Sequence, residues 1–152
     1  MTRSMTLWSR IVILARAGGM AFWVTNFAIS LTPIAAAYRA AFAISYWPMT
    51  LAALVGGLII AVCVSGLLLA FPDRIPGGSS IVKATLLSLA AMSVIEVYSI
   101  AVDADHLSIF HVIGAVMNVP RFLALGVVVG WLARAGARPD PTQTDQIAGS
   151  VR

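Results

Sequence analysis

Two charged residues lie deep inside long apolar stretches in the second half of the chain. Glu96 belongs to the apolar segment that begins at Ile81, and Arg121 belongs to the one that begins at Ile109. A lone charge at this depth in a membrane costs about 2.5–3.5 kcal/mol even on the lenient insertion scale, so such a residue is a candidate functional site by default. A carboxylate and a guanidinium can form an ion pair, relay protons or bind a small ligand.

Other residues share a helical face with each of the two charges. At 100° per residue they fall within an arc of about 80° on each helix. On the earlier helix they are Thr85, Ser88, Met92, Glu96, Ser99 and Asp103, and on the later helix they are His111, Gly114, Asn118 and Arg121. Because lipid cannot solvate polar groups, both faces are predicted to turn inward.

Counting from the turn that joins the two helices places Asn118 between the charges. Glu96 lies about 10 Å below the helix end at Asp103. Arg121 lies about 18 Å below the start of its own helix, and Asn118 about 13 Å below it. The resulting axial gap of about 8 Å is within the combined reach of the two charged side chains.

Two interpretations of this group remain open. In the first, Glu96 and Arg121 form a buried ion pair that fixes the register of two helices and binds nothing. In the second, the group lines a polar cavity that opens to the outer face and binds a small ligand or relays protons. The residues of that candidate site are Glu96, Ser99, Asp103, His111, Asn118 and Arg121.

The sequence contains no catalytic motif and no metal-binding motif. It has no HExxH, no nucleophile with a neighbouring base and no pair of catalytic aspartates, so an enzyme is the least supported class. Cys63 is the single cysteine, which excludes an intrachain disulfide and a thiol metal site built by one chain. His106 and His111 lie near one end of one predicted helix, unlike the opposed ligands of a haem. We expect no cofactor.

The elements that carry these residues are predicted membrane-spanning helices. Of the 152 residues, 60% are hydrophobic and 11% are charged, against roughly 25% charged in soluble domains. The chain is predicted to be an all-α, single-domain integral membrane four-helix bundle. The spans are predicted at about 17–38, 49–71, 81–102 and 109–134. Residues 135–152 are predicted to be a disordered cytoplasmic tail.

The beginning of the chain is predicted to lie at the membrane surface. Arg3, Arg10 and Arg16 surround the apolar run 11–15, which suits an N-terminal interfacial helix with its arginines at the headgroups. Pro33 is predicted to kink the first span.

A cleavable signal peptide is the alternative to a retained first span. The small residues 35–37 would be its cleavage site. The basic leader is long and Asn26 interrupts the apolar region, so we expect the span to be retained.

Small residues recur along the second predicted span. Ala52, Gly56, Cys63, Gly66 and Ala70 fall roughly on one face of that helix. Small side chains let membrane helices approach closely, so Gly56, Cys63 and Gly66 are predicted helix-packing residues, with Cys63 buried.

Basic residues are divided unequally between the two sides of the predicted spans. Arg39 is the single basic residue on one side, which also contains the acidic Asp103 and Asp105. The other side has eight: Arg3, Arg10, Arg16, Arg74, Lys83, Arg134, Arg138 and Arg152. Both termini are therefore predicted to be cytoplasmic, in a bacterial inner membrane. The basic residues form no patch interleaved with aromatic side chains, so nucleic acid is not an expected partner.

The turn before the third predicted span has the sequence Pro-Gly-Gly-Ser-Ser. We interpret Ser79 or Ser80 as the N-cap of the next helix. With Lys83 just inside that helix, an anion or headgroup site is the alternative.

The segment 76–84 resembles a turn found in some uncharacterised prokaryotic four-span membrane proteins. In those proteins a Pro-Gly-x-Ser turn leads into a third span that begins with Lys-Gly, and here Ala84 stands in place of the glycine. The resemblance implies a four-span membrane protein and no particular activity.

Two classes of function follow from these observations. The sequence favours an accessory or structural helix bundle that associates with itself or with another membrane protein. The alternative is a transporter of a small molecule or protons, or a ligand-binding bundle, with its site at Glu96 and Arg121. A cavity at this site would favour the alternative, and a tightly packed core would favour the structural role. The lipid bilayer is the partner expected in both.

Overall fold

The computed structural model describes residues 6–102 and 109–136, and in that part of the chain every regular element is a helix. The helices are α1 (Leu7–Ser30), α2 (Pro33–Ala41), α3 (Tyr46–Ala70), α4 (Ser80–Val102) and α5 (Ile109–Ala135). All except α2 contain a segment long and apolar enough to cross a membrane. The predicted all-α chain with four such helices is thereby confirmed for the described residues. The predicted tail beyond residue 136 lies outside them.

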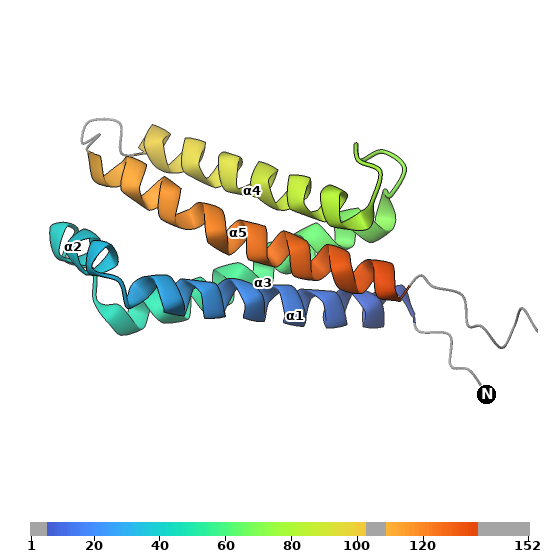
Figure 1. Cartoon of the computed structure of the whole chain (residues 1–152), viewed down its shortest axis with the longest axis horizontal. Helices are drawn as coiled ribbons and strands as arrows, with labels where there is room; N and C mark the ends of the chain where they lie inside the picture. Colours follow the sequence, from blue (N-terminus) through green and yellow to red (C-terminus); the bar gives the residue numbers. More distant parts are fainter. Residues whose placement is uncertain (1–5, 103–108, 137–152) are drawn as a thin grey trace, which may run out of the picture.

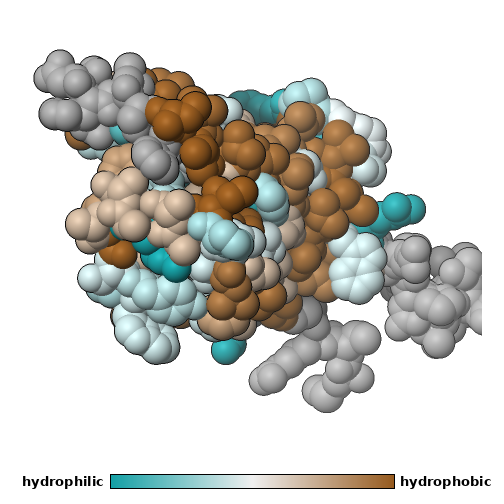
Figure 2. Space-filling view, turned by 60° about the vertical axis from the view of Figure 1, so that its left-hand side comes forward, coloured by the Kyte–Doolittle hydropathy of each residue, from teal (hydrophilic) through white to brown (hydrophobic). Residues whose placement is uncertain are grey.

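The four long helices lie side by side, with α2 at one end of the molecule (Figure 1). Helix α1 packs mainly against α3, and α4 packs mainly against α5, while α1 and α5 join the two pairs. Apolar side chains cover much of the surface visible in Figure 2. Several large apolar residues of the described chain are mostly exposed, such as Val94 on α4 and Leu51 on α3, as expected for helices that face lipid.

The closely packed core lies in the half of the molecule where α1 begins and α5 ends. Its side chains come from all four long helices: Leu14, Ala15, Phe22, Ala61, Val64, Leu68, Ala84, Phe122, Leu125, Val129 and Ala133. Helix α4 buries only Ala84 and Ser88 of its described residues. Residues 93–102 of this helix are exposed, apart from the half-buried Glu96. In the other half of the molecule, α4 therefore packs more loosely against the neighbouring helices.

Helices α4 and α5 come closest where α4 begins and α5 ends. A Cβ atom at Gly130 would collide with the backbone of Ser80 and Ile81. A Cβ atom at Gly126 would lie 2.6 Å from the Cα atom of Thr85. The absence of a side chain at these two positions is what allows the backbones to touch, as small residues often do between membrane helices.

Helix α3 packs through a different face from the one predicted. Gly57 and Ala61 are buried in the core half, whereas a Cβ atom at Gly56 or Gly66 would meet no atom of the described chain within 4 Å. The prediction that Cys63 is buried is wrong, because its side chain is exposed. Cys63 and Gly66 lie on the side of the helix opposite Gly57 and Ala61, while Gly56 borders a space between the helices. That this outer face binds a second protein stays a prediction.

The first span begins and ends earlier than predicted. Helix α1 starts at Leu7, so the residues predicted as a separate interfacial helix form its first turns. It ends at Ser30, and Pro33 occupies the first turn of α2, where Thr32 is the N-cap and accepts the N–H of Ala35. Proline suits that position because the N–H it lacks would have no helical partner there. Pro33 therefore starts a second helix and does not kink the span.

The turn before α4 has the predicted cap. The hydroxyl of Ser79 accepts the backbone N–H of Val82 at 3.3 Å, which confirms Ser79 as the residue that caps α4. The ammonium group of Lys83 donates to the carbonyl oxygen of Pro72 at 2.5 Å. Lys83 thus connects α4 to the turn that follows α3, and the anion-binding alternative stays a prediction.

Candidate polar site between the helices

A chain of hydrogen bonds joins Glu96 to Arg121 across the interface between α4 and α5. The amide nitrogen of Asn118 donates to a carboxylate oxygen of Glu96 at 2.5 Å. The Nη1 of Arg121 donates to the amide oxygen of Asn118 at 2.8 Å. Both charged residues belong to the described chain, and this amide joins them in place of a direct ion pair. The predicted position of Asn118 between the charges is confirmed.

The helices hold this polar chain near the middle of a candidate span. Helix α5 has 27 residues, which corresponds to about 40 Å, and Arg121 lies close to its midpoint. Beside it, the hydroxyl of Ser88 donates to the backbone carbonyl of Phe122 at 2.8 Å and attaches α4 to α5. Lipid offers no hydrogen bonds at such a depth, so the guanidinium depends on partners inside the protein.

A cavity of about 200 Å³ lies beside Arg121 and beneath α2. A single water needs only roughly 10–15 Å³ of such space. The phenol of Tyr38 forms one wall and packs on Gly114, where a Cβ atom would lie 3.1 Å from the phenol oxygen. Burial raises the pKa of Tyr38 above its ordinary value, and the negative charge of Glu96 adds to the effect. The phenol is therefore neutral at physiological pH and can donate a hydrogen bond.

Arg39 fixes the position of α2 over this cavity. Its Nη1 donates to the carbonyl oxygen of Ser30 at 3.0 Å, at the end of α1. Its guanidinium also lies 5.3 Å from the centre of the Tyr46 ring, within range of a cation–π interaction. The negative end of the α1 dipole favours a cation at this point. Arg39 therefore joins α1, α2 and α3 at the end of the molecule where the cavity lies.

A second cavity, of about 320 Å³, reaches Arg121 from the side of α1 and α3. Asn26 lines it and is fully buried, yet neither atom of its amide group has a hydrogen-bond partner. The Nε of Arg121 is also buried without a partner. An unpaired buried polar group costs about 1–3 kcal/mol. Three unpaired atoms around one cavity therefore indicate a site with unused hydrogen-bonding capacity.

The other residues of the predicted site lie elsewhere. Ser99 is exposed, so the prediction that it turns inward is wrong. The ring of His111 packs edge-on against Phe42, with 5.6 Å between ring centres, at the end of α5 nearest α2. Asp103 lies outside the described residues. Of the six predicted residues, Glu96, Asn118 and Arg121 come together.

Two residues of the site were missed by the sequence interpretation. Asn26 was noted only as a polar interruption in an apolar segment, and Tyr38 only as the end of the first predicted span. An amide within a long apolar helix is itself a signal, because it needs a partner from another element. Tyr38 gave no comparable signal, since its position depends on the break between α1 and α2.

The chemistry available at the site is that of binding and proton exchange. Hydrogen-bond donors come from Arg121, Asn26 and Tyr38, and Glu96 supplies a carboxylate. Over residues 6–102 and 109–136, no three His, Cys, Asp or Glu side chains are grouped as metal ligands would be.

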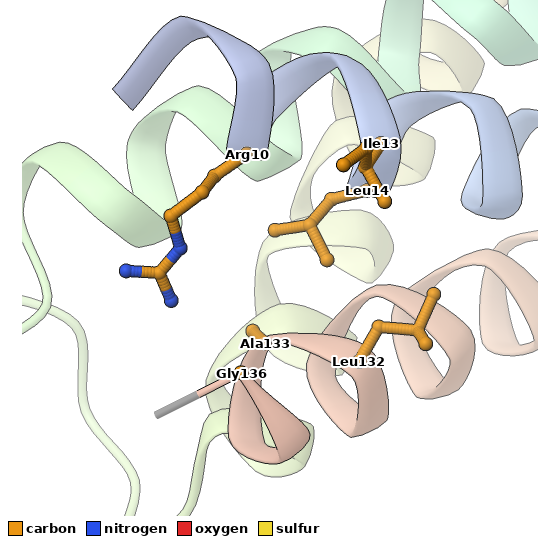
Figure 3. Close-up of a pocket in the computed structure, with 6 residues that line it drawn as sticks. All are labelled: Arg10, Ile13, Leu14, Leu132, Ala133 and Gly136. Atoms are coloured by element: carbon orange, nitrogen blue, oxygen red, sulfur yellow. The ribbon is translucent and has the colours of Figure 1, made fainter. Parts of the chain in front are cut away.

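A third, smaller cavity lies at the opposite end of the molecule. It has about 120 Å³ and is bordered by Arg10 from α1 and by Leu132 and Ala133 near the end of α5 (Figure 3). A Cβ atom at Gly136 would lie 3.7 Å from the Nη2 of Arg10. A cation beside the last turn of a helix is favourable because the free carbonyl groups carry partial negative charge. We interpret Arg10 as a residue that stabilises this helix end.

Comparison of the chain with protein-family models, with curated proteins and with solved structures finds no match. The class is therefore defined by the fold and the site: four helices able to cross a membrane, with an arginine-centred polar site between them.

Proposed function

We propose that this chain is a small multi-pass protein that binds a small polar or ionic ligand at the Glu96–Asn118–Arg121 site, either as a transporter or as a ligand-binding bundle. The observation that carries this proposal is the space of about 200 Å³ and 320 Å³ on two sides of Arg121. Both spaces open to the surface of the molecule, so a ligand can reach Arg121 from outside, whereas a static ion pair needs no such space.

The proposal includes a four-helix bundle in a bacterial inner membrane, with both termini cytoplasmic. Among the described residues, Arg10, Arg16, Arg74, Lys83 and Arg134 lie in the half of the molecule where α1 begins and α5 ends, whereas Arg39 belongs to α2 at the opposite end (Figure 1). Cytoplasmic ends of membrane proteins are enriched in basic residues. The cavity beneath α2 then lies in the outer half of the bundle.

The cavity beneath α2 is expected to contain water, and the rate at which an introduced cysteine is chemically modified can test this. In a Cys63→Ser background, Met117→Cys places a thiol in the cavity wall, and Val116→Cys places one on the adjacent, exposed face of α5. Thiols react through the thiolate, which forms in water and not in lipid. A water-soluble methanethiosulfonate carrying a sulfonate group should modify the Met117→Cys thiol about ten times faster than the Val116→Cys thiol.

The matched pair of neighbouring positions controls for depth in the membrane. Equal, slow reaction at both positions would show that the space is dry and would overturn the proposed function in favour of a structural ion pair.

A second candidate is the accessory role, with α3 as the contact surface. Cys63 is exposed, and Gly66 on the same face leaves the backbone of α3 uncovered. If a second copy packs on this face, Cys63 residues of two chains approach closely. Oxidation with copper phenanthroline in membranes should then give a disulfide-linked dimer of the native protein in high yield. The control is Cys63→Ser/Val94→Cys, whose single thiol lies on the exposed surface of α4 and should give a much lower yield of dimer. Similar yields would indicate random collisions.

A further inference from the structure

The second cavity offers an unusual set of polar groups for the interior of a membrane protein. Asn26 has a free amide donor and a free amide acceptor, and Arg121 has a free Nε–H, all of them buried. The Nη1 of Arg121 is already used by Asn118, so the Nε side of the guanidinium is the one left for a ligand. A matching ligand must accept from Arg121 and must both accept from and donate to the Asn26 amide.

A neutral carboxylic acid meets all of these requirements, and a carboxylate meets all of them except donation to the amide oxygen, which it offsets by a charge-assisted bond to Arg121. As a carboxylate, the group accepts hydrogen bonds from the Arg121 guanidinium and from the Asn26 amide nitrogen. As a neutral acid, its carbonyl accepts from the amide nitrogen while its hydroxyl donates to the amide oxygen. A primary amine, by contrast, supplies only donors when charged and would oppose the positive charge of Arg121.

The other walls of the cavity are apolar and belong to all four long helices. Phe22, Ala53, Ile60, Ile95 and Phe122 are among the residues that line it. These surfaces suit a hydrocarbon portion attached to the carboxyl group, since apolar surface gains free energy when it is buried.

The cavity is bordered on its lipid side by the loosely packed half of α4. Helices α3 and α4 contact each other much less than α4 and α5 do. Ala52 on α3 and Ile95 on α4 line the cavity and are both exposed on the surface of the molecule. A ligand therefore has a route from the hydrocarbon phase between these two helices.

We propose that this cavity binds a small amphipathic monocarboxylic acid that enters from the lipid phase between α3 and α4. Asn26 and Arg121 bind its carboxyl group, and the apolar walls bind its alkyl chain. The inference rests on the proposed function, because it names the ligand class of the same arginine-centred site.

The experiment uses the full chain in phosphatidylcholine nanodiscs with a diazirine-bearing analogue of octanoic acid as the probe. After irradiation, the labelled residues are identified by mass spectrometry. Labels are expected on the cavity-facing residues of α3 and α4. Unlabelled octanoic acid should compete about ten times more effectively than octanol, because its carboxylate forms a charge-assisted hydrogen bond with the Arg121 guanidinium and a hydroxyl forms only a neutral one.

Three variants test the individual groups. Asn26→Leu removes the amide and should reduce labelling about tenfold. Gly56→Leu, at a position where nothing lies within 4 Å of an added Cβ atom, should fill the cavity and abolish acid-specific competition while leaving Asn26 in place. Ser65→Ala is the matched control, because Ser65 is another fully buried polar residue with an unpaired side chain, and it does not line this cavity.

The outcomes separate this inference from the proposed function. Equal competition by octanoic acid and octanol, or labels spread evenly over all lipid-facing helices, would overturn the carboxylic-acid inference. The proposed function would then still be judged by the reactivity of the Met117→Cys thiol, which requires no ligand. Unchanged labelling in both Asn26→Leu and Gly56→Leu would also overturn the inference.

Discussion

Replacing Asn118 with leucine is expected to lower the free energy of unfolding by about 3 kcal/mol, because two charged groups each lose a hydrogen-bond partner and a single bond to a charged group contributes roughly 1.5–3 kcal/mol. The amide of Asn118 donates to Glu96 and accepts from Arg121. Leucine has a similar size but makes neither bond, so a carboxylate and a guanidinium would lose their shared partner near the middle of the span. Reversible unfolding of the purified protein in mixed detergent micelles measures the difference.

Ser99→Leu provides the control for this substitution. Ser99 lies on the same predicted helical face as Glu96, but it is exposed. Its replacement should change the free energy of unfolding by about 0.5 kcal/mol or less. If Asn118→Leu were no more costly than Ser99→Leu, the two charges would be solvated by something other than the asparagine amide, and the bridge would have no role in stability.

Introducing a leucine at Gly130 is expected to lower the free energy of unfolding by about 3 kcal/mol or more, at the upper end of overpacking effects. An added Cβ atom there would collide with the backbone of Ser80 and Ile81. A backbone segment cannot rotate aside as a side chain can, so α4 and α5 would have to separate.

The same change at Gly66 is the matched control, since both glycines lie inside candidate spans. A Cβ atom at Gly66 has no neighbour within 4 Å. Gly66→Leu should therefore be neutral or stabilise the helix by about 1 kcal/mol, because leucine has the higher helix propensity. Equal stability of the two leucine variants would show that α4 and α5 are not in backbone contact.

The positions of the long helices and the centre of the site could be predicted from the sequence. Three of the four helices begin and end within about three residues of their predicted bounds, because the length of an apolar run is itself the constraint imposed by a membrane. Asn118 lies between Glu96 and Arg121 as predicted, because all three positions follow from the rise of an α-helix.

The choice of packing face could not be predicted in the same way. Helix α3 has small residues on two sides, and the side with Gly57 is the one that meets the rest of the chain. Both faces satisfy the rule that small residues favour close approach. The side chains of α1 decide between them, since Phe22 packs directly on Gly57. The prediction that Ser99 turns inward is wrong for a related reason. A polar residue is buried only where another helix packs over it, and the second half of α4 is largely exposed.

The contacts between α4 and α5 also imply an order of assembly during synthesis. Asn118 meets Glu96 at a sequence separation of 22 residues, and Phe122 meets Ser88 at a separation of 34. The glycine contact of Gly130 with Ile81 comes last along the chain. A ribosome that makes α5 from its beginning supplies the polar partners first, and the cost of closing each loop rises only slowly with its length. We therefore expect the asparagine bridge to select the alignment of the two helices before the tight glycine contact can form.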